Sequence, residues 1–247
     1  MNSQILLPQK NNEIDFEFIE SFVAELEAQR FSELEAYLNV TGLKDYKLKD
    51  VEISAIDNLK KVKWQELKIG DYFERVKTKK LPYKAKKLPK EPTGEYILPV
   101  LTSSFMNQGL NYFAPKTGAT IIKNVISIPS NSDVYRSYYQ SREFSVLSDA
   151  YAIEWKDKNK NLSPNVYLFF VSCINKVTDL PIYSYKNKLG GWDVVKNKYI
   201  KFPVDKNGEI DFTFMENLMQ ALKKLSMKDI IIYLDQKIND MKLDIAR

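Results

Sequence analysis

The sequence contains no histidine and only one cysteine. Histidine is the commonest general base near neutral pH and the commonest transition-metal ligand, so its absence excludes Ser-His, Cys-His and zinc-protease chemistry. A single cysteine also excludes internal disulfides and thiolate metal clusters. Cys173 lies in the apolar run VYLFFVSCI, so we expect a buried structural thiol rather than a reactive one.

Long apolar runs and phosphate-binding loops are also missing. No apolar run approaches the roughly 20 residues that span a bilayer. The opening MNSQILLPQKNNEIDF lacks a basic region followed by an apolar core. We therefore expect a soluble cytoplasmic protein with no membrane partner. Neither GxxxxGK[ST] nor GxGxxG occurs, so nucleotide hydrolysis and dinucleotide binding lack their usual phosphate cradles.

Charge is distributed unevenly along the chain. Residues 1–59 carry 5 basic and 12 acidic side chains, a net of −7, whereas residues 60–247 carry 32 and 20, a net of +12. This asymmetry predicts an anionic partner for the middle of the chain and a different partner for its acidic beginning.

The chain also contains a near copy of one of its own segments. Residues 5–26 read ILLPQKNNEIDFEFIESFVAEL, and residues 200–222 read IKFPVDKNGEIDFTFMENLMQAL. One gap at Gly208 aligns both prolines and the shared Glu-Ile-Asp-Phe run, which chance similarity between two helices would not reproduce. The copies are too far apart for a stacked solenoid, so they predict a spacer that recurs between larger modules.

Each copy continues into an apolar helical seam. We expect a spacer helix segment over residues 1–40 and a second one over residues 204–247. Capping-box spacing at Ser32 and Glu35 predicts a helix restart in the first, and a phase change around Ser226 predicts a bend in the second. The seams are predicted to pair with a partner or a second copy, with packing on the chain's own core as the alternative. The seam residues are Phe18, Phe22, Leu26, Leu218, Leu222, Leu225, Ile231, Leu234 and Ile238.

Between the spacers we expect a polar linker over residues 41–62 and a mixed α+β domain over residues 63–203. β-Branched and aromatic runs bounded by Gly, Pro, Asn or Ser predict strands. They are YILPVLT, ATIIKNVISIP, FSVLSDAYAIEW, VYLFFVSCI and KYIKFPV, although NLSPNVYLFFVSCIN is more helical than extended towards its end.

Four clusters in this domain are candidates for nucleic-acid contact. The stretch RVKTKKLPYKAKKLPK holds eight basic residues and no acid, and its prolines favour an extended loop along phosphates. Amide, hydroxyl, arginine and tyrosine groups after the strands offer hydrogen bonds to base edges and phosphates. A Gly pair in YSYKNKLGGWDVVKNK allows a close backbone approach. The alternatives are a solvated loop, ordinary turn residues and core aromatics. The candidates are Lys77, Lys79, Lys80, Lys84, Lys86, Lys87, Ser103, Ser104, Asn107, Gln108, Asn111, Tyr135, Arg136, Tyr138, Tyr139, Arg142, Lys186 and Lys188.

Two other hypotheses remain open. Asp149, Glu154 and Lys156 fit the loose spacing of a magnesium-dependent nuclease, in which carboxylates would hold the metal. The chain could instead be a helical adaptor whose central domain no longer binds DNA. A nuclease would cleave plasmid when the isolated protein is incubated with magnesium. An adaptor would bind its partner but show no salt-dependent affinity for DNA.

The ordered series of segments resembles the specificity (S) subunits of type I restriction-modification systems and the recognition subunits of type IIB systems. The resemblance rests on WQELKIGDYFE, EYILPVLTSSFMNQGLNYF, VISIPSNSDVYRSYY, FSVLSDAYAI and YIKFPVDKNGEIDFTFMENLMQAL. It implies a non-enzymatic subunit with no cofactor of its own, in which a target-recognition domain reads half of a split double-stranded DNA sequence. It also implies that the spacer helices dock a methyltransferase (M) subunit, which holds S-adenosylmethionine, and in the larger assembly a restriction (R) subunit.

One departure affects the assembly that we expect. Members of the family commonly carry two recognition domains, and this chain carries one. The resemblance therefore leaves open a homodimer that reads a symmetric split site, or a half-length or truncated chain that works beside another half-subunit. Pairing of residues 15–38 with residues 212–243 inside one chain is also open.

Overall fold

The computed structural model describes residues 5–245, with side chains up to residue 240. Residues 1–4 and 246–247, the outermost parts of the two expected spacer segments, lie outside the described residues. The chain divides into two compact units. One comprises residues 1–53 and 221–247 and is called the arm unit below; the other comprises residues 54–220 and is called the sheet unit.

The sheet unit contains three sheets. The largest has the strand order β4 (Phe73–Arg75), β10 (Ala150–Trp155), β7 (Val125–Pro129) and β8 (Tyr138–Gln140), with antiparallel neighbours throughout. The second has the order β6 (Leu110–Pro115), β5 (Tyr96–Leu101) and β9 (Ser145–Val146), in which β5 and β9 are parallel. The third pairs β3 (Lys63–Lys68) with β11 (Tyr199–Val204). Strands and helices in one unit confirm the α+β class predicted from the sequence.

The main helix of the sheet unit is α4 (Pro164–Thr178), and the short helical turns are α3 (Ile69–Tyr72), η1 (Ala85–Lys87), η2 (Met106–Gly109) and α5 (Trp192–Val195). Ser163 begins α4 by accepting a hydrogen bond from the Val166 amide, and Pro164 suits the first helical turn. The strand expected for VYLFFVSCI is therefore wrong, and the helical alternative is confirmed. These β-branched and aromatic residues form one buried helix face, so tertiary packing outweighs their strand propensity.

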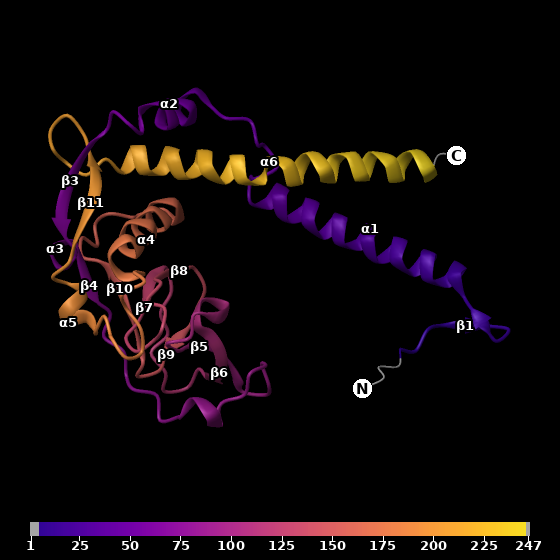
Figure 1. Ribbon diagram of the computed structural model, residues 1–247, viewed down its shortest axis with the longest axis horizontal. Coiled ribbons are helices and arrows are strands. Elements are labelled where there is room, and N and C mark those ends of the chain that lie inside the picture. Colours follow the sequence, from indigo (N-terminus) through magenta and orange to yellow (C-terminus); the bar gives the residue numbers. More distant parts are fainter. Residues whose placement is uncertain (1–4, 246–247) are drawn as a thin grey trace. The chain divides into compact units, whose positions relative to one another are not determined.

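The core of the sheet unit is built around Phe170 of α4. Its ring lies 5.2 Å from that of Trp155, 5.2 Å from Phe73 and 4.9 Å from Phe202. Phe170 is fully buried, and burial of such a side chain stabilises the fold by about 1.5–3 kcal/mol. Helix α4 thereby lies against β7, β8 and β11 (Figure 1). This packing fixes the positions of the loops that leave the strands.

The arm unit contains α1 (Phe16–Val40), the start of α2 (Asp50–Asn58) and the larger part of α6 (Phe212–Ile245). Both long helices are continuous, so the predicted restart at Ser32 and the bend near Ser226 are wrong. The Ser226 hydroxyl donates to the Leu222 carbonyl one turn earlier and remains within the helix. The phase change in α6 reflects two different packing partners. Met215 and Leu218 face the sheet unit core, whereas Ile231 and Leu234 face a cluster in the arm unit.

The segment expected to be a plain linker, residues 41–62, contains α2 and carries a buried ion pair. Glu52 and Lys224 are both only 3% exposed, and Lys224 Nζ lies 3.0 Å from Glu52 Oε2. The Lys224 ammonium also donates to the Lys47 carbonyl at 2.8 Å, and Glu52 Oε2 also accepts from the Lys49 amide at 2.8 Å. Residues 47–52 are therefore tied to α6, and these bonds order the segment that follows α1.

The C-terminal part of α1 packs on the middle of α6 (Figure 1). Leu38, Ile231 and Leu234 are fully buried there, and Ile238 packs against them. The intrachain pairing that the sequence left open is thus present for part of both seams. Ile231 and Leu234 here, and Leu218 in the sheet unit core, are covered by the chain itself, so they do not belong to a partner surface. Among the predicted seam residues, Phe18, Phe22, Leu26, Leu222 and Leu225 remain exposed.

The sequence repeat is also a structural repeat. In the first copy, β1 (Gln9–Lys10) pairs with β2 (Glu13–Ile14), the Asp15 amide donates to the Pro8 carbonyl, and the Asp15 carboxylate caps α1. In the second copy, the Asp211 amide donates to the Pro203 carbonyl at 2.9 Å, and the Asp211 carboxylate accepts from the Phe214 amide at 2.8 Å. The shared pattern of Pro, turn and Asp therefore encodes one turn that starts each long helix.

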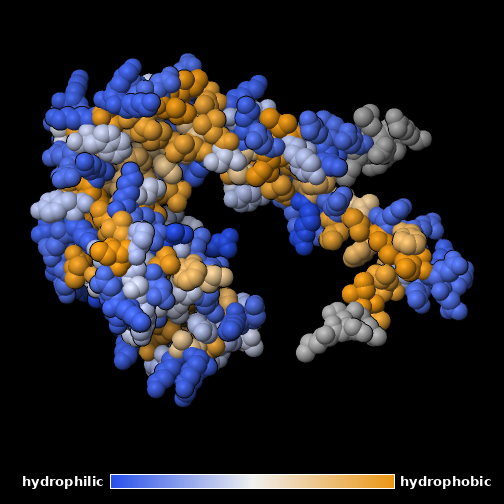
Figure 2. All heavy atoms as spheres, viewed as in Figure 1, coloured by the Kyte–Doolittle hydropathy of each residue, from blue (hydrophilic) through white to orange (hydrophobic). Residues whose placement is uncertain are grey.

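The two copies differ in what covers them. Phe214 and Leu218 of the second copy are buried in the sheet unit core, whereas their counterparts in the first, Phe18 and Phe22, are more than half exposed. Figure 2 shows hydrophobic atoms gathered at the start of α1, beside the β1–β2 hairpin. Within the part of the chain that is described, no helix is long and apolar enough to cross a membrane.

Candidate nucleic-acid interface

The basic segment, residues 75–90, is anchored by two buried leucines between exposed lysines. Leu81 and Leu88 are buried against the sheet formed by β5, β6 and β9, and the Pro89 carbonyl accepts a 3.0 Å hydrogen bond from the Phe113 amide of β6. These contacts hold the segment beside β6 without using the charged side chains. The lysines that the sequence selected are all exposed: Lys77, Lys79, Lys80, Lys84, Lys86 and Lys87.

The loop of residues 102–111 joins β5 to β6 and has an unusual backbone. Asn107, Gln108 and Gly109 have φ values of 47°, 54° and 86°, three consecutive residues in the left-handed region. Gly109 also has little space for a side chain, because an added Cβ would lie in a tight contact 3.0 Å from the Thr102 carbonyl oxygen. Left-handed backbone is costly for a residue such as Gln108, so the surrounding structure must hold this loop in place.

A carboxylate holds one end of the loop. Asp149 Oδ2 accepts hydrogen bonds from the Ser103 amide at 3.2 Å and from the Ser103 hydroxyl at 2.9 Å. Within the loop, the Ser104 amide donates to Thr102 Oγ1 at 3.2 Å, and the Ser104 hydroxyl accepts from the Met106 amide at 3.1 Å. The hydroxyls of Ser103 and Ser104 therefore hold the shape of the loop. Their contact with base edges stays a prediction.

The amides of the loop are unequally available. Asn107 Nδ2 donates to the Leu110 carbonyl at 2.7 Å, and Asn111 Nδ2 donates to the Met106 carbonyl at 3.4 Å. Both asparagines thus use their donor groups inside the loop. The Gln108 side chain is exposed and makes none of the hydrogen bonds found among the described residues, so its amide keeps the donor and acceptor pair that suits adenine.

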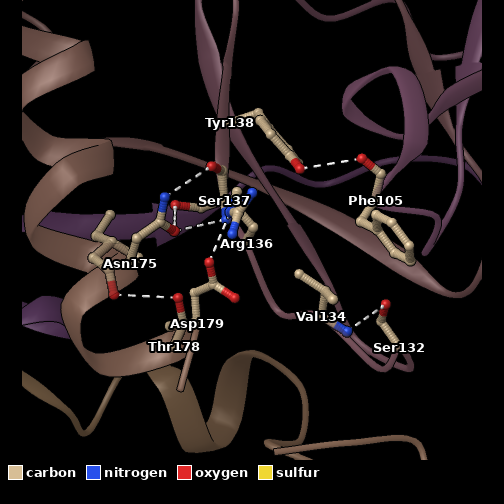
Figure 3. Close-up of polar contacts among 10 residues, drawn as sticks. Phe105, Ser132, Val134, Arg136, Ser137, Tyr138, Asn175, Thr178 and Asp179 are labelled. Carbon is tan, nitrogen blue, oxygen red and sulfur yellow. Dashed lines mark hydrogen bonds and ion pairs between the residues drawn. The ribbon is translucent and has the colours of Figure 1, made fainter. Parts of the chain in front are cut away.

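Strand β8 holds the other side of the loop. The Tyr138 hydroxyl donates to the Phe105 carbonyl at 3.2 Å (Figure 3). Gln140, which is 4% exposed, donates from Nε2 to the Gln108 carbonyl at 3.2 Å and to Ser127 Oγ at 3.0 Å. Partial burial raises the pKa of the Tyr138 hydroxyl, which therefore remains a donor at neutral pH. These bonds bring together the candidate residues of the loop, 103–111, and those of residues 135–142.

Arg136 precedes β8 and is oriented by α4. Its Nε lies 2.7 Å from Asp179 Oδ2, and that hydrogen bond and charge raise the pKa of the guanidinium further (Figure 3). Next to it, Ser137 donates from its amide and hydroxyl to Asn175 Oδ1, each at 2.7 Å. Asp179 engages Nε, and the Tyr138 hydroxyl also interacts with the guanidinium, so the terminal nitrogens of Arg136 are only partly free for an acceptor such as guanine O6 or N7.

The remaining predicted residues have mixed outcomes. Tyr135 is 1% exposed and packs in the core against Tyr183, so its selection as a DNA contact is corrected. Tyr135 lies in the segment before β8, where side chains alternate between buried and exposed, and this alternation turns its ring into the core. Tyr139 is half-buried and stacks on Tyr167 at 5.1 Å, while Arg142 is exposed.

The candidate lysines of residues 183–188 lie on a loop beside the segment that precedes β8. The Tyr185 amide donates to Asp133 Oδ1 at 2.8 Å, which connects the loop of residues 183–188 to the segment before β8. Lys186 and Lys188 are exposed on this loop, and Lys188 Nζ lies 4.9 Å from the centre of the Tyr185 ring. Contacts therefore connect the loop of residues 102–111 to the segment that carries Arg136, and connect that segment to the loop with these lysines. The basic segment lies along the sheet formed by β5, β6 and β9, which also carries the loop of residues 102–111.

Sequence reasoning missed several residues that position these groups. Gln140, Asn175 and Asp179 contact the predicted side chains or their backbone, but they come from separate parts of the chain and no short motif marks them. Phe105 and Met106 were also missed. The sequence did contain a signal for them. Two large apolar residues inside a polar turn that ends in glycine are expected to be exposed, and exposed apolar residues indicate a contact surface.

The nuclease alternative is not supported. Asp149 binds Ser103, Glu154 pairs with Lys158 at 2.9 Å, and Lys156 binds the Gly70 carbonyl. Asp149 directly precedes β10 and Glu154 lies within it, so five steps along an extended chain separate their Cα atoms by roughly 16 Å. Two ligands of one magnesium ion lie about 2 Å from it, which this spacing prevents. Among the described residues, no group of three or more acidic, cysteine or histidine side chains is placed to hold a metal.

The charge of the region favours an anion. Residues 75–132 contain ten basic side chains and two acidic ones, Glu91 and Glu95, a net of +8. Asp149 is engaged with Ser103, and Asp179 is neutralised by Arg136. A surface of this sign attracts polyanions from a distance.

Comparison with known proteins gives a match that covers most of the chain. Residues 61–231, more than half of the chain, match the family described as type I restriction modification DNA specificity domain. The specificity subunit S.BcgI of a type II restriction enzyme from Heyndrickxia coagulans is 22% identical over 220 residues, which cover 89% of this chain and 58% of that protein.

Solved structures give weaker matches of the same kind. The S subunit of a type I restriction-modification system from M. genitalium is 15% identical, with a TM-score of 0.43, covering 90% of this chain and 54% of that one. The HsdS subunit from Thermoanaerobacter tengcongensis is 13% identical, with a TM-score of 0.41, covering 88% and 52%. The chain thus spans slightly more than half the length of the relatives it matches.

Proposed function

Because the chain belongs to the type I restriction modification DNA specificity family, we propose that it binds double-stranded DNA and directs a partner methyltransferase to one sequence. The family match is the observation that carries this proposal. The exposed lysines of residues 75–90 and the net charge of residues 75–132 support it, because both suit a phosphate backbone.

We infer that different residues contact the phosphates and the base edges. Lys77, Lys79, Lys80, Lys84, Lys86 and Lys87 bind phosphates and hold the duplex without reading its sequence. Gln108 and Arg136 reach base edges, because both side chains are exposed, Gln108 on a loop held by Gln140 and Arg136 with its guanidinium oriented by Asp179. Lys186 and Lys188 extend the phosphate contacts.

The decisive experiment compares adenine methylation across the host genome with and without the gene. The proposal predicts that one sequence motif loses its methylation in the deletion strain. Exchange of residues 64–203 for those of a relative should then change which adenine is methylated. An unchanged methylome in both experiments would contradict the proposal.

A binding experiment tests the basic segment separately. With its methyltransferase partner, the protein should bind duplex DNA with a logarithmic salt slope that becomes shallower by roughly 0.9 for each phosphate that is no longer neutralised. Replacement of Lys84, Lys86 and Lys87 by glutamine should therefore reduce the slope by about 3. The matched control replaces three exposed lysines outside the segment, Lys60, Lys61 and Lys63, and should leave the slope unchanged. Equal slopes in both variants would show that the segment does not contact phosphate.

The partners follow from the same family. A methyltransferase (M) subunit binds S-adenosylmethionine and carries the chemistry, and a restriction (R) subunit joins in assemblies that also cleave. The arm unit supplies the docking surface for the M subunit. Co-purification of the complete chain with a co-expressed M subunit tests this, and recovery of each protein alone would contradict it.

We propose that the recognition domain of residues 63–203 reads half of a split site and that a second recognition domain reads the other half. The first copy of the repeat supports pairing with a second copy of this chain, because it leaves Phe18 and Phe22 exposed and stacked 6.1 Å apart, with Leu26 on the same helix. Two identical faces of this kind can pack symmetrically. A different half-subunit is the second candidate, and the exposed face supports it equally.

Measurement of mass in solution separates these two candidates. Replacement of Phe18 and Phe22 by glutamate should convert a dimer to a monomer in light scattering, whereas Ile182→Glu, an exposed position in the sheet unit, should not. A monomeric unaltered chain that binds DNA only after a second subunit is added would favour the half-subunit.

A further inference from the structure

Two large apolar side chains stand at the tip of the loop between β5 and β6. Phe105 is 50% exposed and Met106 is 63% exposed. They follow the serines that are tied to Asp149 and Thr102, and they precede the left-handed residues Asn107 and Gln108. Neither belongs to any of the hydrophobic clusters of the described residues. Packing within the chain therefore does not explain them.

The backbone beneath these side chains is held from three directions. The Phe105 carbonyl accepts from the Tyr138 hydroxyl, and the Gln108 carbonyl accepts from Gln140 Nε2, each at 3.2 Å. The Thr102 amide donates to the Gly109 carbonyl at 2.9 Å and closes the loop. Figure 3 shows the Phe105 carbonyl directed at Tyr138 and its ring turned away from that contact. A loop held in this way keeps its tip in one place when a ligand arrives.

The surroundings of the tip fit nucleic acid better than a protein partner. Residues 96–132 contain no acidic side chain, and basic residues 75–90 lie on the same sheet as the loop. The Asp149 carboxylate at the base of the loop is hydrogen-bonded to Ser103. An apolar pair in a positive field matches a ligand with phosphates outside and stacked apolar faces inside. A base-pair step of a DNA duplex has this chemistry.

We propose that Phe105 and Met106 form an apolar wedge that enters between two adjacent base pairs of the bound duplex and unstacks that step. The proposal rests on the proposed DNA-binding function and assigns a second kind of sequence reading to the same site. Pyrimidine–purine steps such as TA and CA unstack most easily, so the wedge selects for them through the energy of deformation, without a hydrogen bond to either base. Gln108, two residues beyond Met106, then reads the edge of a neighbouring base.

The experiment uses the complete chain in complex with its methyltransferase partner and a pool of duplexes with a randomised central segment. Sequences enriched by the unaltered complex are bound again and treated with permanganate, which oxidises thymines that have lost their stacking. Three variants are compared: Phe105→Ala/Met106→Ala, the conservative Phe105→Leu/Met106→Leu, and Ile97→Ala as a matched control. Ile97 is 52% exposed on β5 but lies outside the loop.

The proposal predicts a permanganate-reactive thymine at one fixed step of the enriched duplexes. The double alanine variant should lose that reactivity and bind about ten- to a hundredfold more weakly, the range found when a side chain that stacks on a base is truncated. Its logarithmic salt slope should stay unchanged, because no phosphate contact is removed. The leucine variant should keep both properties, since it remains apolar and large, and the Ile97 control should match the unaltered protein. Melting temperatures should agree among all of them, because the altered side chains are exposed.

Two failures are distinguishable. If the unaltered complex enriches no sequence, the proposed DNA-reading function fails and the wedge fails with it. If it enriches a sequence whose thymines remain stacked, or if the double alanine variant binds within twofold of the unaltered protein, the wedge alone is overturned. Loss of methyltransferase binding in the alanine variant, with DNA affinity retained, would likewise overturn it and assign the apolar pair to a protein contact.

Discussion

Replacement of Glu52 by alanine should destabilise the arm unit more than the removal of any exposed or half-exposed ion pair. Glu52 and Lys224 are both 3% exposed, and the change leaves the Lys224 ammonium buried without its counter-ion. The Lys49 amide loses its acceptor as well. Removal of one partner of a buried pair costs roughly 3–5 kcal/mol. The matched control is Glu66→Ala, because the Glu66–Lys201 pair is about two-thirds exposed on both sides and should contribute at most about 1 kcal/mol.

Urea denaturation followed by circular dichroism measures the change in the free energy of unfolding. Hydrogen exchange of the amides at residues 51–58 reports α2 directly, since it should open locally when its tie to α6 is broken. The combined variant Glu52→Leu/Lys224→Met removes both charges and should recover part of the stability. A cost below about 1 kcal/mol for Glu52→Ala, or a combined cost equal to the sum of the single costs, would refute this reasoning.

Three further predictions concern the sheet unit. Burial raises the pKa of the Cys173 thiol to about 12, so iodoacetamide at pH 8 should label the folded protein far more slowly than the urea-unfolded chain. The Cys173 thiol keeps its proton in the folded state, whereas the unfolded chain releases it near pH 9. The free energy of unfolding should therefore fall between about pH 9 and pH 12, and a value that stays constant over this range would contradict the prediction. Gly109→Ala places a side chain at φ 86° and 3.0 Å from the Thr102 carbonyl oxygen, so it should cost more than about 1 kcal/mol and reduce sequence discrimination while the salt slope stays constant. Arg136→Lys should weaken discrimination between bases at one base pair by about 1–3 kcal/mol, as measured by competition binding. An unchanged base preference at every position of the site would show that Arg136 does not read a base.

The sequence identifies the parts of this fold that depend on local chemistry. The α+β class, strands such as Tyr96–Leu101 and Tyr199–Val204, and the two helix-starting turns all follow from residue patterns within short windows. The exposure of the basic segment also follows, because eight cations within 16 residues that contain no acid cannot be buried together. These features need no knowledge of distant contacts.

Other features depend on partners that are remote in the chain. Residues 166–174 favour a strand by composition, and they become helical because Phe170 fills a space between Phe73, Trp155 and Phe202. The direction in which Tyr135 points depends on the same packing, so a binding role and a core role looked alike from the sequence. Gln140 donates a hydrogen bond to the loop of residues 102–111, and Asp149 accepts one from it. These bonds span 32 and 46 residues, which no local motif encodes.

The continuity of α6 has a consequence for how this protein can diverge. The helix runs unbroken through 34 residues, or about 51 Å, and it begins in the sheet unit and ends in the arm unit. Each residue added near its middle advances the following part by about 1.5 Å and also rotates it by about 100°. An insertion of one or two residues would therefore turn the apolar side chains of the arm away from their partners, whereas about seven or eleven residues nearly restore their azimuth. Viable length variants of this helix should accordingly differ by whole turns.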